Sequence, residues 1–150
     1  MSSQIHLGAS DYDGILGTPT SQQIIRWLSI WSDLSVKELC EKIGVSESQI
    51  HSTLRKLAGI GVVTKVRRGS YSLGTEPFVS HLKEAYLSNS TNLVNSNIYQ
   101  IKQLLKRKEI EEAENLYNHL VKLYEPLLKE RFSLVMHSLA HSFIDYYGIL

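Results

Sequence analysis

The sequence predicts a mainly α-helical protein that carries one small β-hairpin. Apolar residues recur at helical spacing through most of the chain, which is typical of amphipathic helices. β-Branched residues gather in residues 62–67, and Arg68-Gly69 supplies turn chemistry before a second short strand at residues 70–73. The 150 residues suffice for one ordinary domain, or for a small module with a helical extension.

The composition is that of a globular protein, with 43% hydrophobic and 21% charged residues. Cys40 is the single cysteine, so we expect no intramolecular disulfide, no multi-thiolate metal site and a reducing, cytoplasmic compartment. No apolar segment approaches the ~20 residues that a membrane span needs, and the N-terminus has no signal-peptide pattern. We therefore expect no membrane partner.

The formal net charge of +1 conceals an uneven distribution. Residues 20–75 hold eight basic and four acidic side chains, a net charge of +4. Residues 1–19 hold two acidic side chains, and residues 76–150 hold eight basic and nine acidic ones, so these segments carry −2 and −1. We expect three regions with these bounds: an N-terminal arm, a compact central module and a helical C-terminal region. The balanced total excludes a uniformly basic coat protein, but it leaves room for a local basic surface.

Capping-box spacings predict the starts of the first two helices of the central module. Thr20 with Gln23 precedes a broad apolar face, and we expect this helix over residues 21–31. Ser35 with Glu38 opens a second amphipathic helix of about two turns.

A tight turn, Gly44-Val45-Ser46, joins the second helix to a third one. Ser46 with Gln49 repeats the capping spacing at the start of the third helix. The inward-facing apolar positions of this helix are Ile50, Leu54 and Leu57. The predicted hairpin follows directly, with arginines at its tip, so the module has the form of a helix-turn-helix with a wing.

The central module resembles a known class of domain. One pattern combines four features of the module. These are the short second helix, the turn Gly44-Val45-Ser46, the Leu-x-x-Leu of the third helix, and Gly61 with the two apolar residues that follow it. In this pattern residues 20–75, half of the chain, resemble the winged helix-turn-helix of ArsR- and MarR-type prokaryotic transcriptional regulators. The resemblance implies binding of double-stranded DNA and regulation of transcription by a nucleoid-associated protein.

The exposed face of the third helix carries the residues that such a domain would place in the major groove. We expect base readout from Ser48, Gln49, His51 and Ser52. Gln49 is the best candidate for adenine, because its amide can pair bidentately with N6 and N7. The alternative use of Gln49 is to cap its own helix. We expect contacts to the DNA backbone from Ser46, Arg55, Lys56, Lys65, Arg67 and Arg68. The alternative for the basic residues is a merely solvated face.

The C-terminal region is predicted to be helical. We expect a helix that begins near Pro77 and ends in a polar loop at residues 88–92, then amphipathic stretches at residues 98–108 and 110–125. Pro126 predicts a kink or restart before a last helix that reaches Tyr147. This last helix is apolar on more than one face. Its apolar residues are Leu127, Leu128, Phe132, Leu134, Val135, Leu139, Phe143, Ile144, Tyr146 and Tyr147.

Such a helix must be buried on several sides, so we expect a homodimer that places two recognition helices on a near-palindromic operator. The alternative is a helix that completes an intrachain core. Five aromatic residues are expected to pack in the core, which is the usual role of such side chains. The alternative is that they line a pocket between helices for an unidentified small-molecule effector. These residues are Tyr86, Tyr99, Tyr117, Tyr124 and Phe132.

Other constellations predict no chemistry. His137, His141 and Asp145 share one helix stripe, but their spacing does not reproduce the ligand pattern of ArsR-type metal sensors, so we expect no metal and no cofactor. Cys40 is expected as a small buried hydrophobe. No catalytic motif is present in the sequence, so we expect no enzyme. The alternatives to a regulator are a winged-helix module that binds other proteins and a nucleoid-architectural dimer with low sequence specificity.

Overall fold

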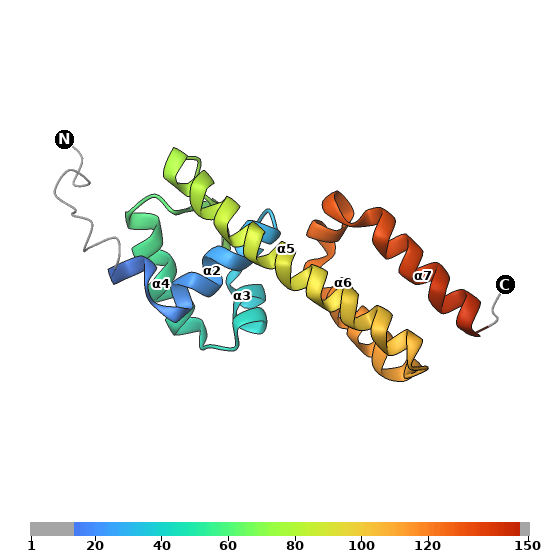
Figure 1. The fold of residues 1–150 in the computed structure, drawn as a ribbon. Helices are drawn as coiled ribbons and strands as arrows, with labels where there is room; N and C mark the ends of the chain where they lie inside the picture. Colours follow the sequence, from blue (N-terminus) through green and yellow to red (C-terminus); the bar gives the residue numbers. More distant parts are fainter. Residues whose placement is uncertain (1–13, 148–150) are drawn as a thin grey trace. The chain divides into compact units, whose positions relative to one another are not determined.

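The computed structural model describes residues 14–147, except the side chains of residues 130, 131, 133, 134, 146 and 147 (Figure 1). The described chain is mainly helical with one small three-stranded antiparallel sheet, so the predicted mainly α-helical class with a little β-structure is confirmed. The chain divides into two compact units, and the division falls between Leu87 and Ser88. This point lies within a helix, 12 residues after the boundary expected at residue 75. Most of the predicted arm, residues 1–13, lies outside the described residues.

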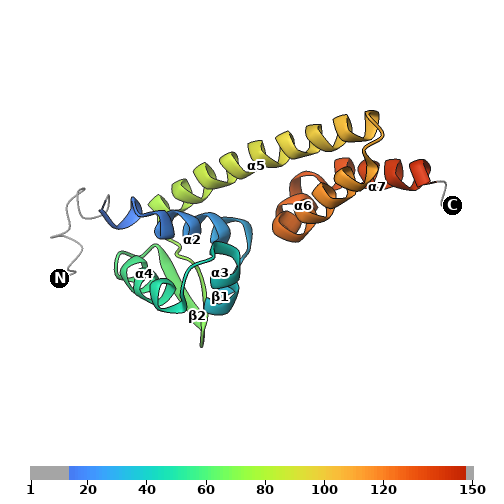
Figure 2. The same ribbon diagram turned by 90° about the horizontal axis from the view of Figure 1, so that it is seen from below.

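The first unit contains the three strands described below, three helices that precede or separate them, and the first part of a long helix, α5 (Pro77–Lys106). Apart from α5, these elements are α2 (Pro19–Ile30), β1 (Leu34–Ser35), α3 (Val36–Ile43), α4 (Glu47–Gly59), β2 (Val63–Arg67) and β3 (Ser70–Leu73). The helices pack on one another and on the sheet, as Figure 2 shows. The fully buried side chains at this junction include Ile24, Ile25, Leu34, Leu39, Ile50, Leu54, Leu57 and Val62.

The start of α2 differs from the prediction. Thr18 is the N-cap, and its Oγ1 accepts a hydrogen bond from the Ser21 backbone N–H at 3.2 Å. Pro19 occupies the first helical position, where its fixed φ suits the helix and its missing N–H costs nothing. The predicted cap at Thr20 is therefore wrong, and this residue is buried within the helix instead.

The predicted capping box of α3 is confirmed. The Glu38 N–H donates to Ser35 Oγ at 3.0 Å, and the Ser35 N–H donates to Glu38 Oε1 at 2.9 Å. The helix ends at Gly44, whose φ of 80° is the left-handed conformation that favours glycine. Cys40, expected to be buried, is only half-buried.

The hairpin of β2 and β3 is confirmed, and a third strand joins it. β3 lies between its two neighbours, with Leu34 of β1 and Lys65 of β2 both in register with Tyr71. β1 has two residues, too few for the alternating pattern that identifies a strand in a sequence. The register of β2 shifts between Lys65 and Arg67, and the intervening Val66 is 46% exposed.

The predicted loop at residues 88–92 does not exist. α5 runs without interruption over Pro77–Lys106, so the segment expected as a separate helix from residue 98 belongs to it. Ser90 and Val94 are buried, and together with Leu87, Ile98 and Ile101 they continue one stripe at three- and four-residue spacing. Burial along this stripe outweighs the low helix propensity of the serines and asparagines between them.

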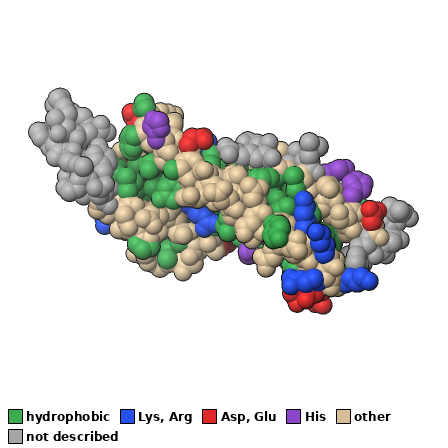
Figure 3. All heavy atoms as spheres, viewed as in Figure 1, with side chains coloured by type: hydrophobic (Ala, Val, Ile, Leu, Met, Phe, Trp, Pro, Cys, Tyr) green, Lys and Arg blue, Asp and Glu red, His purple; other side chains and the backbone are tan. Residues whose placement is uncertain are grey.

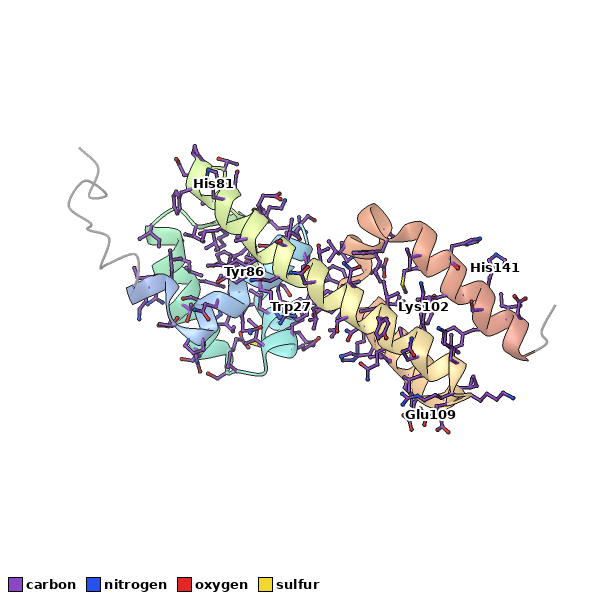
Figure 4. All side chains as sticks on the ribbon, in the orientation of Figure 1. Trp27, His81, Tyr86, Lys102, Glu109 and His141 are labelled. Atoms are coloured by element: carbon purple, nitrogen blue, oxygen red, sulfur yellow. The ribbon has the colours of Figure 1, made fainter. Side chains whose placement is uncertain are left out.

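Tyr86 lies on the part of α5 that belongs to the first unit (Figure 4). Burial of this side chain raises the pKa of its phenol above the ordinary value of 10.0.

The second unit contains the later part of α5, then α6 (Ile110–Arg131) and α7 (Ser133–Tyr147). The predicted kink is confirmed, with non-helical angles at Tyr124, two residues before Pro126. The prediction of one last helix from Pro126 to Tyr147 is wrong, because the chain leaves helical geometry at Phe132. No helix among the described residues has the length and apolarity that crossing a bilayer requires.

The apolar face of α7 contributes to a core within the second unit. Met136, Leu139 and Phe143 are buried, and the Phe143 ring packs on Tyr117 of α6 with the centroids 5.3 Å apart. Tyr124, Leu127 and Leu128 of α6 are buried as well. Burial of these residues fits the alternative of an intrachain core, while Ile144 remains 36% exposed. The predicted apolar surface also included Leu134, Tyr146 and Tyr147. The side chains of these three residues lie outside the described ones.

Candidate nucleic-acid interface

The start of α4 is fixed by local hydrogen bonds. Ser46, in extended conformation, caps the helix by accepting from the Gln49 N–H at 3.2 Å. Ile50, Leu54 and Leu57 bury one side of the helix, as predicted. This burial orients the opposite side towards solvent.

Six of the predicted DNA-contacting residues lie on that exposed side. At about 100° per residue they cover about 160° of the helix circumference, opposite the buried side chains. These residues are Ser48, Gln49, His51, Ser52, Arg55 and Lys56, and each is exposed. The structure therefore brings together the α4 residues predicted for base readout and those predicted for backbone contacts.

A groove adjoins this surface, and it has a volume of about 970 Å³. α4 contributes Ser48, Gln49, Ser52, Thr53 and Lys56 to its lining, and the opposite wall comes from the start of α2 and the residues before it. The second wall consists mainly of small residues and includes Gly14, Thr18, Thr20 and Ser21. Hydroxyl groups of this kind donate and accept hydrogen bonds, so the groove is suited to a polar ligand with both kinds of group.

Gln49 does not cap its own helix with its side chain. Its Nε2 donates to Thr20 Oγ1 of α2 at 2.6 Å. The amide keeps one N–H and its carbonyl oxygen, which are the two groups that a bidentate contact with adenine uses. Sequence reasoning treated capping and base contact as competing uses of Gln49 and did not identify Thr20 as its partner. No pattern in the sequence links these two residues.

His51 lies beside a carboxylate on its own helix. Its Nε2 lies 3.6 Å from Glu47 Oε1, and both side chains are largely exposed. Glu47 occupies the first turn of α4, where a carboxylate is favoured by the positive end of the helix. Ser48 and Ser52 line the groove, whereas His51 does not. These side chains therefore occupy different parts of the exposed surface of α4.

The basic residues of the hairpin differ in whether they make an ion pair. Arg67 Nη2 forms an ion pair with Asp33 Oδ1 at 3.0 Å, which partly neutralises its charge. Lys65 and Arg68 are exposed and make no ion pair among the described residues. Val66 lies between them in the chain and is exposed, so the hairpin carries an apolar side chain that the sequence analysis did not single out.

Two further basic residues of the first unit lie against tryptophan rings. Arg26 Cζ is 4.9 Å from the ring centroid of Trp27, which Figure 4 labels on α2. Lys42 Nζ is 5.2 Å from the Trp27 centroid and 4.4 Å from that of Trp31. Cations over an indole face are held by the ring quadrupole, so the contacts of Lys42 stabilise the junction of α2 and α3, while that of Arg26 lies within α2. The basic residues of α4 and the hairpin form the candidate interface.

The histidine pair singled out in the sequence belongs to the second unit. His137 and His141 of α7 place their Nε2 atoms 3.0 Å apart, and both are exposed. No group of three or more metal-ligating side chains occurs among the described residues. No family model matches this chain, and comparison with curated proteins and with solved structures likewise finds no match.

Proposed function

We propose that this protein is a sequence-specific transcriptional regulator that binds double-stranded DNA through a winged helix-turn-helix. In this proposal α3 and α4 form the helix-turn-helix, and β2 and β3 form the wing. The order of the elements in the first unit, two helices joined by a tight turn and followed by a hairpin, supports this proposal. A cytoplasmic, nucleoid-associated location and the absence of enzymatic activity follow from the proposal.

The exposed side of α4 carries this proposal. It combines polar groups that can pair with base edges and two basic residues, and it contains no large apolar side chain. An α-helix with such a surface fits the major groove, where donors, acceptors and methyl groups distinguish the base pairs. Arg55 and Lys56 lie farther along the helix, where the DNA backbone passes, and Lys65 and Arg68 of the hairpin add two more cations.

A homodimer acting on a near-palindromic operator is part of the proposal. Large apolar side chains remain exposed on helices of the second unit: Leu93 at 41%, Tyr99 at 66% and Ile144 at 36%. A second copy would cover such residues, and two-fold symmetry would present two α4 helices to two half-sites. Light scattering coupled to size-exclusion chromatography measures the mass in solution, and a monomer of 17.0 kDa at micromolar concentration would contradict this part.

The experiment that tests DNA binding is selection from a pool of random duplexes, followed by titration of selected and scrambled duplexes at two salt concentrations. We expect tighter binding to the selected duplex, and weaker binding at the higher salt concentration because phosphate contacts release counterions. Equal binding to all duplexes would indicate an architectural protein. No binding at low salt would indicate a module that binds other proteins.

The matched variants are Arg55→Gln with Lys56→Gln, and Lys83→Gln with Lys122→Gln. Each pair removes two positive charges, but the second pair lies outside the proposed interface, on α5 and α6. We expect the first pair to weaken binding to all duplexes and the second to leave it unchanged. Equal effects of the two pairs would show that total charge, rather than the α4 surface, determines binding.

A further inference from the structure

The second unit contains a groove between the later part of α5 and α7, with a volume of about 390 Å³. α5 contributes Lys102, Leu105 and Lys106, and α7 contributes Ser138, Leu139 and Ser142. Figure 4 labels Lys102 on α5 and shows α7 beside this end of the helix. The volume lies in the range of about 300–1,000 Å³ that is usual for small-molecule sites.

The two lysines form a basic wall. They are four residues apart on one helix face, both are exposed, and neither makes an ion pair among the described residues. Other bases of this unit do have acidic partners: Lys129 lies 3.1 Å from Glu125, and Arg107 lies 3.5 Å from Glu109. Like charges at this spacing repel each other on a helix, so an anion held between the two ammonium groups would relieve the repulsion.

The opposite wall supplies hydroxyl groups and no charge. Ser142 Oγ donates to the Ser138 carbonyl oxygen at 3.0 Å, so the Ser142 hydroxyl has only acceptor capacity left. The Ser138 hydroxyl makes no hydrogen bond among the described residues and can donate to an anion. Among the residues that the structure describes, no carboxylate lines the groove. In the view of Figure 3, basic side chains gather near the end of α5.

Apolar surface lies between the two walls. Leu139 is buried and Leu105 is half-buried, and both line the groove. An inorganic anion would leave this surface wet, whereas an amphiphilic anion would cover it and gain the hydrophobic free energy of burial. Two lysines also suit a single negative charge better than a polyanion, which needs a longer basic track.

We propose that this groove binds a small organic monoanion with a short apolar body, of the class of medium-chain carboxylates. The carboxylate lies between Lys102 and Lys106 and accepts from Ser138, and the hydrocarbon lies on Leu105 and Leu139. This site is separate from the proposed DNA-binding surface of α4, and its existence does not depend on DNA binding.

The test is titration calorimetry of the full chain, without DNA, with octanoate below its micellar concentration. We expect saturable binding, and binding at least about tenfold weaker for 1-octanol, which lacks the charge, and for acetate, which lacks the hydrocarbon. No saturable binding of octanoate would overturn the proposal. Equal affinity for 1-octanol or for acetate would overturn it as well, because one half of the recognition would then be absent.

The variants Lys102→Gln with Lys106→Gln remove the basic wall at exposed positions, so circular dichroism should show an unchanged fold. We expect octanoate affinity to fall about tenfold, while the matched pair Lys83→Gln with Lys122→Gln leaves it unchanged. Ser138→Trp, which fills the groove from an exposed position, should abolish binding. Octanoate binding that survives both groove variants would place the ligand elsewhere and contradict the assignment.

Discussion

At the scale of single residues, the hydrogen bond between Gln49 and Thr20 has the most direct consequence for the proposed function. It joins the start of α2 to the first turn of α4 across 29 residues of sequence. A glutamine side chain in solution samples many rotamers, and fixing it costs conformational entropy on binding. In the proposed complex with DNA, the Thr20 hydroxyl would remove part of this cost before binding, so we propose Thr20 as a positioning residue.

Thr20→Val tests this role, because valine has the shape of threonine but accepts no hydrogen bond. We expect affinity for the selected duplex to fall about three- to tenfold, the effect of one hydrogen bond, with less discrimination against substitution of one base pair. The slope of affinity against salt should not change, since no charge is altered. Anisotropy titrations measure all three quantities, with Thr64→Val as the control on an exposed position of β2. A changed salt slope in Thr20→Val would argue against pure positioning.

Gly74 occupies a position in the first unit where there is no room for a side chain. Its N–H donates to the Val62 carbonyl at 2.7 Å, and a β-carbon here would overlap the Gly61 carbonyl oxygen. Backbone atoms cannot move aside as a flexible side chain can, so the end of β3 would have to shift.

We expect Gly74→Ala to lower the free energy of unfolding by about 1–3 kcal/mol, the usual effect of overpacking. The control is Gly59→Ala at the end of α4, where a β-carbon meets no atom within 4 Å. This control should be neutral or should raise stability by up to about 1 kcal/mol through helix propensity. Urea denaturation measures both changes, and equal stability of the two variants would contradict the packing at Gly74.

At the scale of elements, α5 shows how burial overrides local propensity. Residues 88–92 are rich in serine and asparagine, which favour caps and turns because their side chains compete for backbone hydrogen bonds. The same segment contains no glycine or proline, and buried Leu87, Ser90 and Val94 keep helical spacing through it. The continuous stripe therefore determines the helix.

Asn92→Pro distinguishes a continuous helix from a loop, because Asn92 is exposed and its replacement removes no core contact. In a helix interior we expect a loss of about 3 kcal/mol or more in the free energy of unfolding, since proline cannot donate the backbone hydrogen bond. Asn92→Ala should instead be neutral or slightly stabilising. If Asn92→Pro unfolds at the wild-type denaturant concentration, the segment is a loop and the continuity of α5 is wrong.

At the scale of the whole molecule, charge is divided between internal contacts and the proposed interface. Of the eight bases in residues 20–75, Arg26 and Lys42 lie over indole rings and Arg67 pairs with Asp33. The exposed bases of α4 and the hairpin that make no ion pair among the described residues are Arg55, Lys56, Lys65 and Arg68. If each of these four bases contacts one phosphate, as proposed, we expect a slope of log affinity against log salt of about −3.6 per chain, at about −0.9 for each contact.

Asp33→Asn releases Arg67 for a further phosphate contact. We expect tighter binding at low salt and a slope steeper by about 0.9 per chain, whereas Arg68→Gln should make the slope shallower by about the same amount. Fluorescence anisotropy across a salt series measures the slope, with Lys122→Gln as the control outside the interface. An unchanged slope in Asp33→Asn would show that Arg67 already contacts phosphate or does not reach the DNA.

The sequence alone determined the elements whose signals are local. The capping box of α3, the cap of α4, the buried positions Ile50, Leu54 and Leu57 and the hairpin were all predicted, because each depends on residues a few positions apart. The same local signals predicted which side of α4 faces solvent. The candidate interface on α4 was therefore largely predictable.

The tertiary structure decided what depends on residues distant in the chain. The bond from Gln49 to Thr20 and the ion pair of Arg67 with Asp33 span 29 and 34 residues. β1 is identified only by its pairing with β3, and the groove between α5 and α7 exists only because two helices place their side chains together. Such contacts leave no periodic pattern in the sequence, since only folding brings their partners within reach of each other.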